Sequence, residues 1–495
     1  MSNMFLFIAS LLVLHMDMNS IRMRRDAIVD HLREASSMGY NAVLWEVEDK
    51  IKWETCPECV HPEAFSKREF REILAEAESL GLEPIPLMQT FAHAEYILSH
   101  EKYRPWREVD ANPTCYCVSK LDVREFQKRF LFEYLDLFGP SVKNFHLGAD
   151  EAHAFGTCPA CVKRDKFELF MEHLDGLASV LRERGIRPGI WCDMMLTGKL
   201  SDAQIDAQVN KFPKYLTAWY WDYYYGSEEK NLSYWAGRID HLTENGFSVI
   251  FAPATASWGD SPFLPMYGKH SDNVAAAAEL TRRKNLHGLC VTSWSVHLSP
   301  KRLQYPLWEL AAQRYLAPGD SVEKDFSAIL VRRLGTDDIQ MMKDITSWFP
   351  SLIPFDSRFG TCAAKWARPI AGTAKDGIER YRREEPDYVP PLPCEIEANF
   401  ASVRKALSKM ETKSSDLRMA PFISGARLAI RHAETIADEL GGKVPVRFPE
   451  EESRRFFGIE QSASSAALSS SLVWMPLAGE GGKFAETASV NQKGR

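Results

Sequence analysis

The 495-residue chain has no apolar run long enough to span a membrane and no large excess of charge of either sign. A transmembrane helix needs about 20 consecutive apolar residues, and no segment reaches that length. The net charge of -7 offers no basic surface for nucleic acid or an anionic membrane, so we expect neither as a partner. Aromatic residues, in contrast, are abundant at 11%. They either fill a large core or stack on flat apolar faces such as those of sugar rings.

The apolar run from Phe5 to Leu14 has the length of a secretion signal but lacks the usual flanks. No basic residue precedes it and no small-x-small cleavage site follows. It continues directly into His15-Met16-Asp17, as a strand does when it delivers polar groups to a loop. The pattern favours a first core strand and a cytoplasmic protein, with secretion as the alternative.

Strand-like segments alternate with amphipathic helical segments up to residue 315. The predicted strands are 5–16, 41–45, 83–87, 144–148, 187–191, 216–220, 247–251 and 288–293, and the clearest helices are 24–37, 67–80, 123–137, 167–184, 273–284 and 302–315. Eight such units predict an α/β fold, a (β/α)8 TIM barrel over residues 1–318. A doubly wound open sheet is the alternative, and the lack of a glycine-rich phosphate loop disfavours it. Residues 319–460 predict an α-helical C-terminal region, and the Ser-, Ala- and Gly-rich residues 461–495 a flexible tail.

Polar and aromatic residues follow almost every predicted strand. In a barrel, the residues just after the strands share the C-terminal face, where active sites lie. The candidates are Glu46, Glu48, Asp49, His93, His146, Asp150, Glu151, Trp191, Asp193, Tyr220, Trp221, Asp222, Tyr223, Trp294 and His297. Aromatic walls around carboxylates are what a carbohydrate pocket requires.

The segment His146-Leu147-Gly148-Ala149-Asp150-Glu151 places two adjacent carboxylates at a strand end. They repel each other, and partial burial raises the pKa of at least one, so the pair is costly unless it performs chemistry. An ordinary acidic loop with a helix-capping Asp is the alternative.

The segment HLGADE resembles the H-x-G-x-D-E signature of glycoside hydrolase family 20, the β-N-acetylhexosaminidases. HMDM, WEVED, PLMQTFAHAEY and the later G-x-C-P-x-C resemble the hexosaminidase D-like branch, and the resemblance covers about residues 10–318. It implies an exo-acting glycoside hydrolase that removes terminal β-linked GlcNAc or GalNAc with net retention. The substrate's own 2-acetamido group is the nucleophile in this family, and no cofactor is required.

The resemblance also implies roles for the candidates. Glu151 is the general acid/base, with a raised pKa that keeps it protonated, and Asp150 orients the acetamido group. Tyr220 or Tyr223 donates to the acetamido carbonyl, and His93 supports the acid. Asp222 is implied to bind ring hydroxyls of the sugar. Trp191, Trp221 and Trp294 are implied to form the pocket walls, and His146 to support the pocket from behind.

Two departures leave hydroxyl recognition open. The best-studied members have an Arg after strand one, where this chain has His15-Met16-Asp17-Met18, and a Glu two residues after the strand-eight Trp, where it has Val296. Glu46, Glu48, Asp49 and His297 are the candidates to replace them.

Two C-P-x-C pairs, Cys56/Cys59 and Cys158/Cys161, follow strands two and four. Four such thiolates suit a structural zinc ion, whereas free reduced thiols are favoured by the long gap between the pairs, and disulfides come last. Two other functions remain open: a non-catalytic amino-sugar-binding barrel, and a metal-dependent hydrolase using His15, His146 and Asp193.

Overall fold

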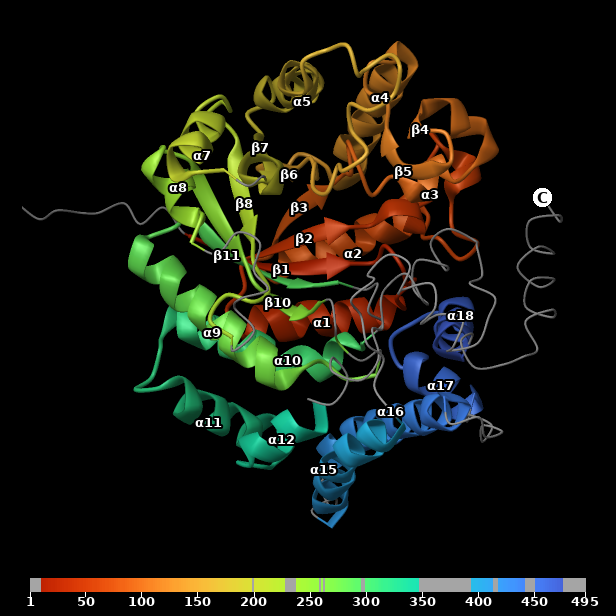
Figure 1. The fold of residues 1–495 in the computed structure, drawn as a ribbon, viewed down its shortest axis with the longest axis vertical. Coiled ribbons are helices and arrows are strands. Elements are labelled where there is room, and N and C mark those ends of the chain that lie inside the picture. Colours follow the sequence, from red (N-terminus) through yellow and green to blue (C-terminus); the bar gives the residue numbers. More distant parts are fainter. Residues whose placement is uncertain are drawn as a thin grey trace, which may run out of the picture.

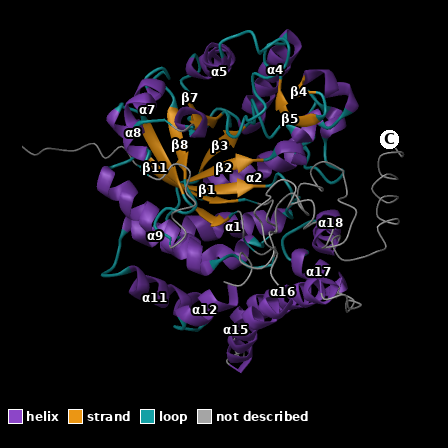
Figure 2. Cartoon of the chain, viewed as in Figure 1, coloured by secondary structure: helices purple, strands orange, loops and turns teal. Residues whose placement is uncertain are grey.

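The computed structural model describes residues 10–197, 200–227, 237–257, 260, 263–294, 299–346, 393–412, 417–440 and 450–474. Within these ranges the chain forms a closed parallel barrel surrounded by helices, with further helices packed beside it (Figures 1 and 2). No helix in the described part of the chain is long and apolar enough to cross a bilayer.

The barrel has eight neighbouring strand positions, as the sequence predicts. In order around the barrel they are β1 (Leu11–Asp17), β2 (Ala42–Glu46), β3 (Glu83–Leu87), β6 (Asn144–His146), β7 (Arg187–Trp191), β8 (Thr217–Trp221), β9 (Ser248–Ala252) and β11 (Gly288–Ser293). Every neighbouring pair is parallel, and β1 pairs with β11 to close the barrel. Pro253 interrupts the seventh strand position, so that β10 (Ala254–Ala256) continues beyond β9 and pairs with β11. The first strand begins at Leu11, and residues 5–9 of the expected strand lie outside the described ranges.

The helices form an outer layer around the strands, as Figure 2 shows. They are α1 (Arg25–Ser37), α2 (Lys67–Ser79), α4 (Leu121–Phe138), α5 (Lys166–Arg182), α7 (Asp202–Val209), α8 (Ile239–Glu244), α9 (Tyr267–Lys284) and α10 (Tyr305–Leu316). An insertion between β3 and α4 contains α3 (Glu95–Leu98) and an antiparallel hairpin of β4 (Arg107–Val109) and β5 (Asn112–Tyr116), which the sequence pattern did not predict. This hairpin lies over the same end of the barrel as the loop that follows β6.

Strand alternation divides the core into an interior and an outer layer. Successive residues of a strand point to opposite faces, so Leu11 and Val13 pack inside the barrel while Leu12 and Leu14 pack against the helices. Trp191 and Trp219 belong to the interior set. The same alternation places polar side chains in the barrel near the carboxyl ends of the strands, where the site forms.

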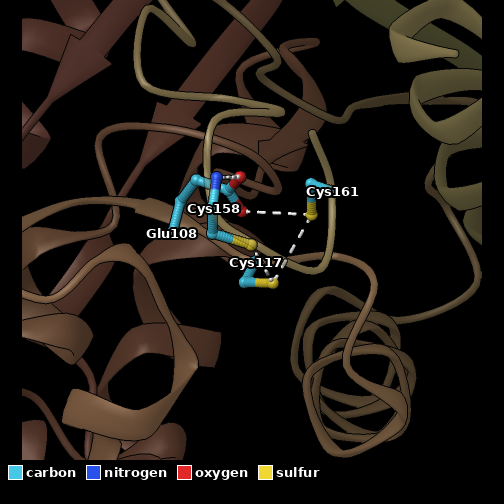
Figure 3. A group of neighbouring side chains, drawn as sticks. All are labelled: Glu108, Cys117, Cys158 and Cys161. Atoms are coloured by element: carbon cyan, nitrogen blue, oxygen red, sulfur yellow. Dashed lines mark hydrogen bonds between the residues drawn. The ribbon is translucent and has the colours of Figure 1, made fainter. Parts of the chain in front are cut away.

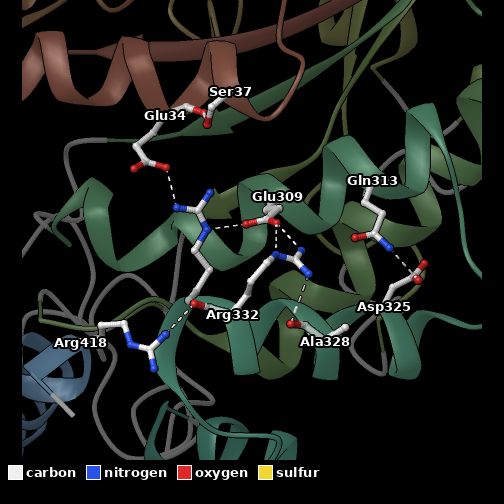
Figure 4. A network of polar contacts seen from close by, with 9 residues as sticks. Glu34, Ser37, Glu309, Gln313, Asp325, Ala328, Arg332 and Arg418 are labelled. Atoms are coloured by element: carbon white, nitrogen blue, oxygen red, sulfur yellow. Dashed lines mark hydrogen bonds and ion pairs between the residues drawn. The ribbon is translucent and has the colours of Figure 1, made fainter.

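The C-terminal helices are α11 (Val322–Leu334), α12 (Ile339–Thr346), α15 (Pro393–Thr412), α16 (Ala420–Leu440), α17 (Glu450–Phe457) and α18 (Ala463–Trp474). A charged network ties α11 to the barrel helices (Figure 4). Arg333 donates to Glu34 of α1 at 2.6 Å, and both Arg332 and Arg333 pair with Glu309 of α10. Arg418 donates to the Arg332 carbonyl and extends the network to the segment before α16.

The segment around Glu460 is bound to the C-terminal face of the barrel, where the strands end. The buried Glu460 carboxylate accepts the backbone N–H groups of Lys301 and Arg302, each at 2.7 Å. Gln461 forms a bridge with Met23 in the loop after β1. In place of the flexible tail expected from residue 461, the chain therefore continues into α18, because these contacts fix its start; residues 475–495 lie outside the described ranges.

Candidate active site

A chain of buried polar side chains lies inside the barrel, below its C-terminal face. His15 Nε2 lies 3.1 Å from Glu46 Oε2, and Gln89 Nε2 donates to Glu46 Oε1 at 3.1 Å. All three side chains are almost completely buried. Burial lowers the pKa of His15 to about 4, so His15 is neutral at physiological pH.

The loop after β6 adopts left-handed backbone conformations at three positions of the segment from Gly148 to Glu151, which carries the two adjacent carboxylates. Ala149 and Glu151 have positive φ angles of 76° and 46°, and Gly148 has φ +62°. Across the described ranges only three other non-glycine residues have positive φ, and two of these, Glu48 and His93, lie in neighbouring loops of the same face. Such conformations cost about 1–3 kcal/mol each and cluster at functional sites.

His93 bridges the two adjacent carboxylates. Its Nε2 atom lies 3.3 Å from Asp150 Oδ2 and 3.4 Å from Glu151 Oε2. Burial alone would lower the pKa of His93, but the charge of Asp150 and hydrogen bonds to both carboxylates raise it well above 6.5. His93 is therefore a cation between two carboxyl groups.

The two carboxylates differ in their surroundings. Asp150 is 6% exposed, and its second oxygen, Oδ1, is buried without a hydrogen-bond partner among the described residues. Glu151 is 46% exposed at the side chain, and its hydrogen bond with His93 lowers its pKa. The expectation of a raised pKa for Glu151 is therefore wrong for the free protein, because the hydrogen bond with His93 and its charge outweigh the effect of burial.

Asp193 is the carboxyl group with a raised pKa. It is 3% exposed, accepts the Glu151 backbone N–H at its Oδ2 atom (2.9 Å), and lies 3.4 Å from Trp221 Nε1 at its Oδ1 atom. Burial, followed by the charge of Asp150, raises its pKa to about 8. Asp193 therefore positions the Glu151 backbone and is largely protonated at neutral pH.

Aromatic rings from three strands enclose this group. Tyr223 stacks on Trp221 with 5.2 Å between ring centroids, and it lies 6.3 Å from Trp294. Trp191, completely buried, lies 5.8 Å from Trp294 and closes the floor. The carboxylates thus lie at the edge of an aromatic enclosure.

Sequence and fold comparisons point to one family. No protein-family model matches the chain. The chain is 28% identical over 272 residues to Hexosaminidase D of Bos taurus, covering 52% of this chain and 76% of that protein. It is 28% identical over 196 residues to Hexosaminidase D of Homo sapiens, covering 38% of this chain but only 39% of that longer relative. Its fold is similar to the crystal structure of β-N-acetylhexosaminidase from Bacteroides fragilis NCTC 9343, with a TM-score of 0.52, 17% identity and coverage of 66% of this chain and 70% of that one.

The chain is therefore similar to the β-N-acetylhexosaminidases of glycoside hydrolase family 20. Its barrel brings together Asp150, Glu151, His93, Asp193 and Tyr223, which lie in the segments that follow four different strands.

Strand register distinguishes the two candidate tyrosines. Tyr220 points outward from β8, where it contacts Phe251 in the outer core with 5.2 Å between ring centroids. Tyr223 lies beyond the strand end, close enough to Asp150 and Glu151 for their charges to raise its pKa further after burial. Tyr223 is therefore the tyrosine that faces the carboxylates.

Several predicted substrate contacts have internal partners instead. Asp222 is buried and its Oδ1 atom accepts the backbone N–H groups of Tyr224 and Tyr225 at 3.1 and 3.0 Å, so it shapes a turn. His146 is completely buried 4.4 Å from Trp191, and its Nδ1 accepts the Gly148 N–H at 3.0 Å. Burial lowers the pKa of His146 well below 6.5, so it supports the floor as a neutral ring.

The candidates for hydroxyl recognition divide in the same way. Both oxygens of Glu46 have partners inside the barrel, and Glu48 is 2% exposed. Asp49 pairs with Lys50 and is 20% exposed at the side chain. His297 lies outside the described residues. The sequence analysis did not identify Gln89, which donates a hydrogen bond to Glu46. Gln89 lies two residues after Leu87, whose side chain points into the barrel, and only this spacing could have indicated that Gln89 points inward as well.

The two C-P-x-C pairs do not meet, so the four-cysteine site is wrong. Cys158 and Cys161 lie with Cys117 and Glu108, the one group in the described ranges whose donor atoms are arranged to hold a metal ion (Figure 3). Cys59 lies instead beside Cys56 and His100, and a hydrogen bond with Cys56 lowers the pKa of Cys59 to about 7. The pairs are separated because β3 lies between the strands that precede them.

Proposed function

We propose that this protein is a family 20, exo-acting β-N-acetylhexosaminidase that hydrolyses terminal β-linked GlcNAc or GalNAc with retention of configuration. The observation that carries the proposal is the contact of His93 with both Asp150 and Glu151 beneath an aromatic wall. The similarity to Hexosaminidase D supports the same reaction, because family 20 enzymes use the substrate's acetamido group as the nucleophile.

Asp150 is assigned to the acetamido group. Its Oδ1 atom is buried and has no hydrogen-bond partner within the described part of the chain, and such an atom is costly unless a ligand satisfies it. The acetamido N–H is a donor of the right kind. Accepting that hydrogen bond turns the acetamido oxygen toward the anomeric carbon and stabilises the positive charge of the cyclic oxazolinium intermediate.

Glu151 is assigned to proton transfer, because it is the more exposed carboxyl group and can reach the glycosidic oxygen. In the free protein the proton of the Glu151–His93 pair resides on His93, whose pKa is raised while that of Glu151 is lowered. Glu151 takes up this proton as substrate binds, donates it to the leaving oxygen, and then activates the water that opens the intermediate.

Tyr223 is assigned to the acetamido carbonyl oxygen. Its ring stacks on Trp221, and the charges of Asp150 and Glu151 contribute to its raised pKa, so its hydroxyl lies near both carboxylates. A hydroxyl donor at this position stabilises the developing charge during attack. Trp191, Trp221 and Trp294 supply apolar surface for the acetamido methyl and the sugar face.

The test is hydrolysis of aryl β-GlcNAc and aryl β-GalNAc by the wild type, Glu151→Gln and Asp150→Asn. We expect Glu151→Gln to lower kcat/KM by about 10²–10⁴-fold for poor leaving groups and much less for activated ones, which need little protonation. Asp150→Asn should slow both leaving-group classes. The control is Glu101→Gln, which makes the same change at a side chain that is 82% exposed, and it should leave turnover unchanged.

Two outcomes would replace the proposal. Wild-type protein that binds GlcNAc but turns over neither substrate would be an amino-sugar-binding barrel. Turnover that survives Glu151→Gln and is abolished by a chelator would indicate a metal-dependent hydrolase. A substrate with an N-trifluoroacetyl group separates the mechanisms further, because a weaker acetamido nucleophile slows the reaction only if that group attacks.

A further inference from the structure

Four side chains from three separate segments converge outside the catalytic group. Glu108 belongs to β4, Cys117 follows β5, and Cys158 and Cys161 lie in the loop after β6. Figure 3 shows the three sulfur atoms and the carboxylate facing one another. Three of these side chains are almost fully buried, and Cys158 is partly buried.

The spacing of the four donor atoms matches a tetrahedral zinc site. Cys117 Sγ lies 3.5 Å from Cys158 Sγ and 3.6 Å from Cys161 Sγ, and Cys161 Sγ lies 3.5 Å from Glu108 Oε2. With Zn–S near 2.3 Å and Zn–O near 2.0–2.2 Å, the edges of a tetrahedron around zinc are about 3.5–3.8 Å. All four donor atoms lie within 4.8 Å of one another.

The carboxylate is oriented for this purpose by its second oxygen. Glu108 Oε1 accepts the backbone N–H groups of Thr157 and Cys158 at 2.8 and 2.9 Å. These two bonds turn Oε2 toward the cysteines. Ser119 Oγ lies 3.1 Å from Cys161 Sγ, where a hydroxyl can donate to a thiolate. Fixed partners behind the ligands are typical of metal sites.

We propose that Glu108, Cys117, Cys158 and Cys161 form a closed structural zinc site. Three soft thiolates and one carboxylate suit Zn²⁺, and four protein ligands leave no open coordination position for catalysis. The proposal does not depend on the hydrolase activity, because metal binding is measured without substrate.

The zinc site joins the two loops that supply the catalytic group. Cys158 follows Asp150 and Glu151 in the loop after β6. The β4–β5 hairpin, which carries Glu108, pairs with the backbone on either side of His93: Tyr116 N–H donates to the Phe91 carbonyl at 2.9 Å, and Ala94 N–H donates to the Thr114 carbonyl at 3.2 Å. Zinc at the junction would therefore hold His93 in register with both carboxylates.

Metal content of the full-length chain, purified with reductant and then dialysed against buffer containing a trace of zinc, is the direct test. We expect about one zinc per chain, with an X-ray absorption spectrum that fits three sulfurs and one oxygen. Cys161→Ser and Glu108→Gln should lose most of the metal. Cys59→Ser changes the same position of the other C-P-x-C pair and should retain it.

Cobalt substitution of the wild-type protein provides a readout that does not depend on the folding of any variant. Bound Co²⁺ should give sulfur-to-metal charge-transfer bands and tetrahedral d–d absorption. Less than a tenth of an equivalent of either metal, or a disulfide among the three cysteines in the reduced preparation, would overturn the proposal. Zinc bound equally by wild type and Cys161→Ser, but lost from Cys59→Ser, would overturn it as well.

Discussion

Gly148→Ala tests whether the strained loop before the two carboxylates depends on close packing against Gln89. A Cβ atom at position 148 would lie 2.1 Å from Gln89 Oε1 and 2.9 Å from its Cδ, at a φ of +62°. The left-handed conformation costs an alanine about 1 kcal/mol more than a glycine. Gln89 can move aside only by giving up its 3.1 Å hydrogen bond to the Glu46 carboxylate. Such a bond contributes about 1.5–3 kcal/mol.

We therefore expect Gly148→Ala to lower the free energy of unfolding by roughly 2.5–4 kcal/mol. Urea denaturation followed by tryptophan fluorescence measures this change. Gly81→Ala is the matched control, because Gly81 has φ +77° with no atom within 4 Å of the added Cβ, and it should cost only about 1 kcal/mol. In a Gln89→Ala background, where the hydrogen bond to Glu46 is already lost and the space is open, Gly148→Ala should cost only about 1 kcal/mol more. Equal losses for the two glycine variants would refute the packing argument.

Three further predictions concern His93, the two tyrosines and Glu460. His93→Gln removes the group that holds the proton of the Glu151–His93 pair, whose pKa is raised well above 6.5. The proton must then be held by the Glu151 carboxyl, which loses it at lower pH, so the alkaline fall of kcat/KM should move to lower pH; an unchanged profile would contradict the His93 assignment. Tyr223→Phe should lower kcat on the order of 10²-fold, whereas Tyr220→Phe, which loses a bond to Asp222, should cost only about 1 kcal/mol of stability in a thermal melt. Glu460 has its pKa lowered to about 2, so its stabilising effect is complete above pH 4.5 and is lost as the pH falls toward 2. Glu460→Gln should therefore flatten the acid-unfolding curve, and a curve as steep as wild type would exclude Glu460.

The barrel could be predicted from the sequence because its signals are local. Each strand alternates between interior and outer-layer side chains, and the glycines that end several helices, such as Gly81 and Gly185, mark where the next strand begins. The β4–β5 hairpin was missed because strands of three and five residues around a proline carry too little periodicity. The helix α18 was missed because a serine- and alanine-rich composition resembles that of a flexible tail.

For the candidate site, the sequence could predict which residues follow the strands but not which of them contact one another. The spacing of HLGADE placed Asp150 and Glu151, but the direction of the Glu151 pKa depended on His93, which comes from a different loop. The ligands of the predicted metal site were wrong for a similar reason. Cys158 and Cys161 are visible as a pair, whereas Cys117 and Glu108 have no motif, and only the hairpin brings them together. Register likewise decided between Tyr220 and Tyr223.

The charge balance of the catalytic group explains why three acidic residues can share one end of the barrel. Asp193 keeps its proton at neutral pH because burial and Asp150 raise its pKa to about 8, and His93 supplies one positive charge between Asp150 and Glu151. Two carboxylates and one cation leave about one net negative charge. We infer that this surplus complements the positive charge that develops on the sugar during attack by its acetamido group. If so, Asp193→Asn, which retains a neutral side chain, should preserve far more activity than Asp150→Asn, and equal losses would show that the surplus charge is arranged differently.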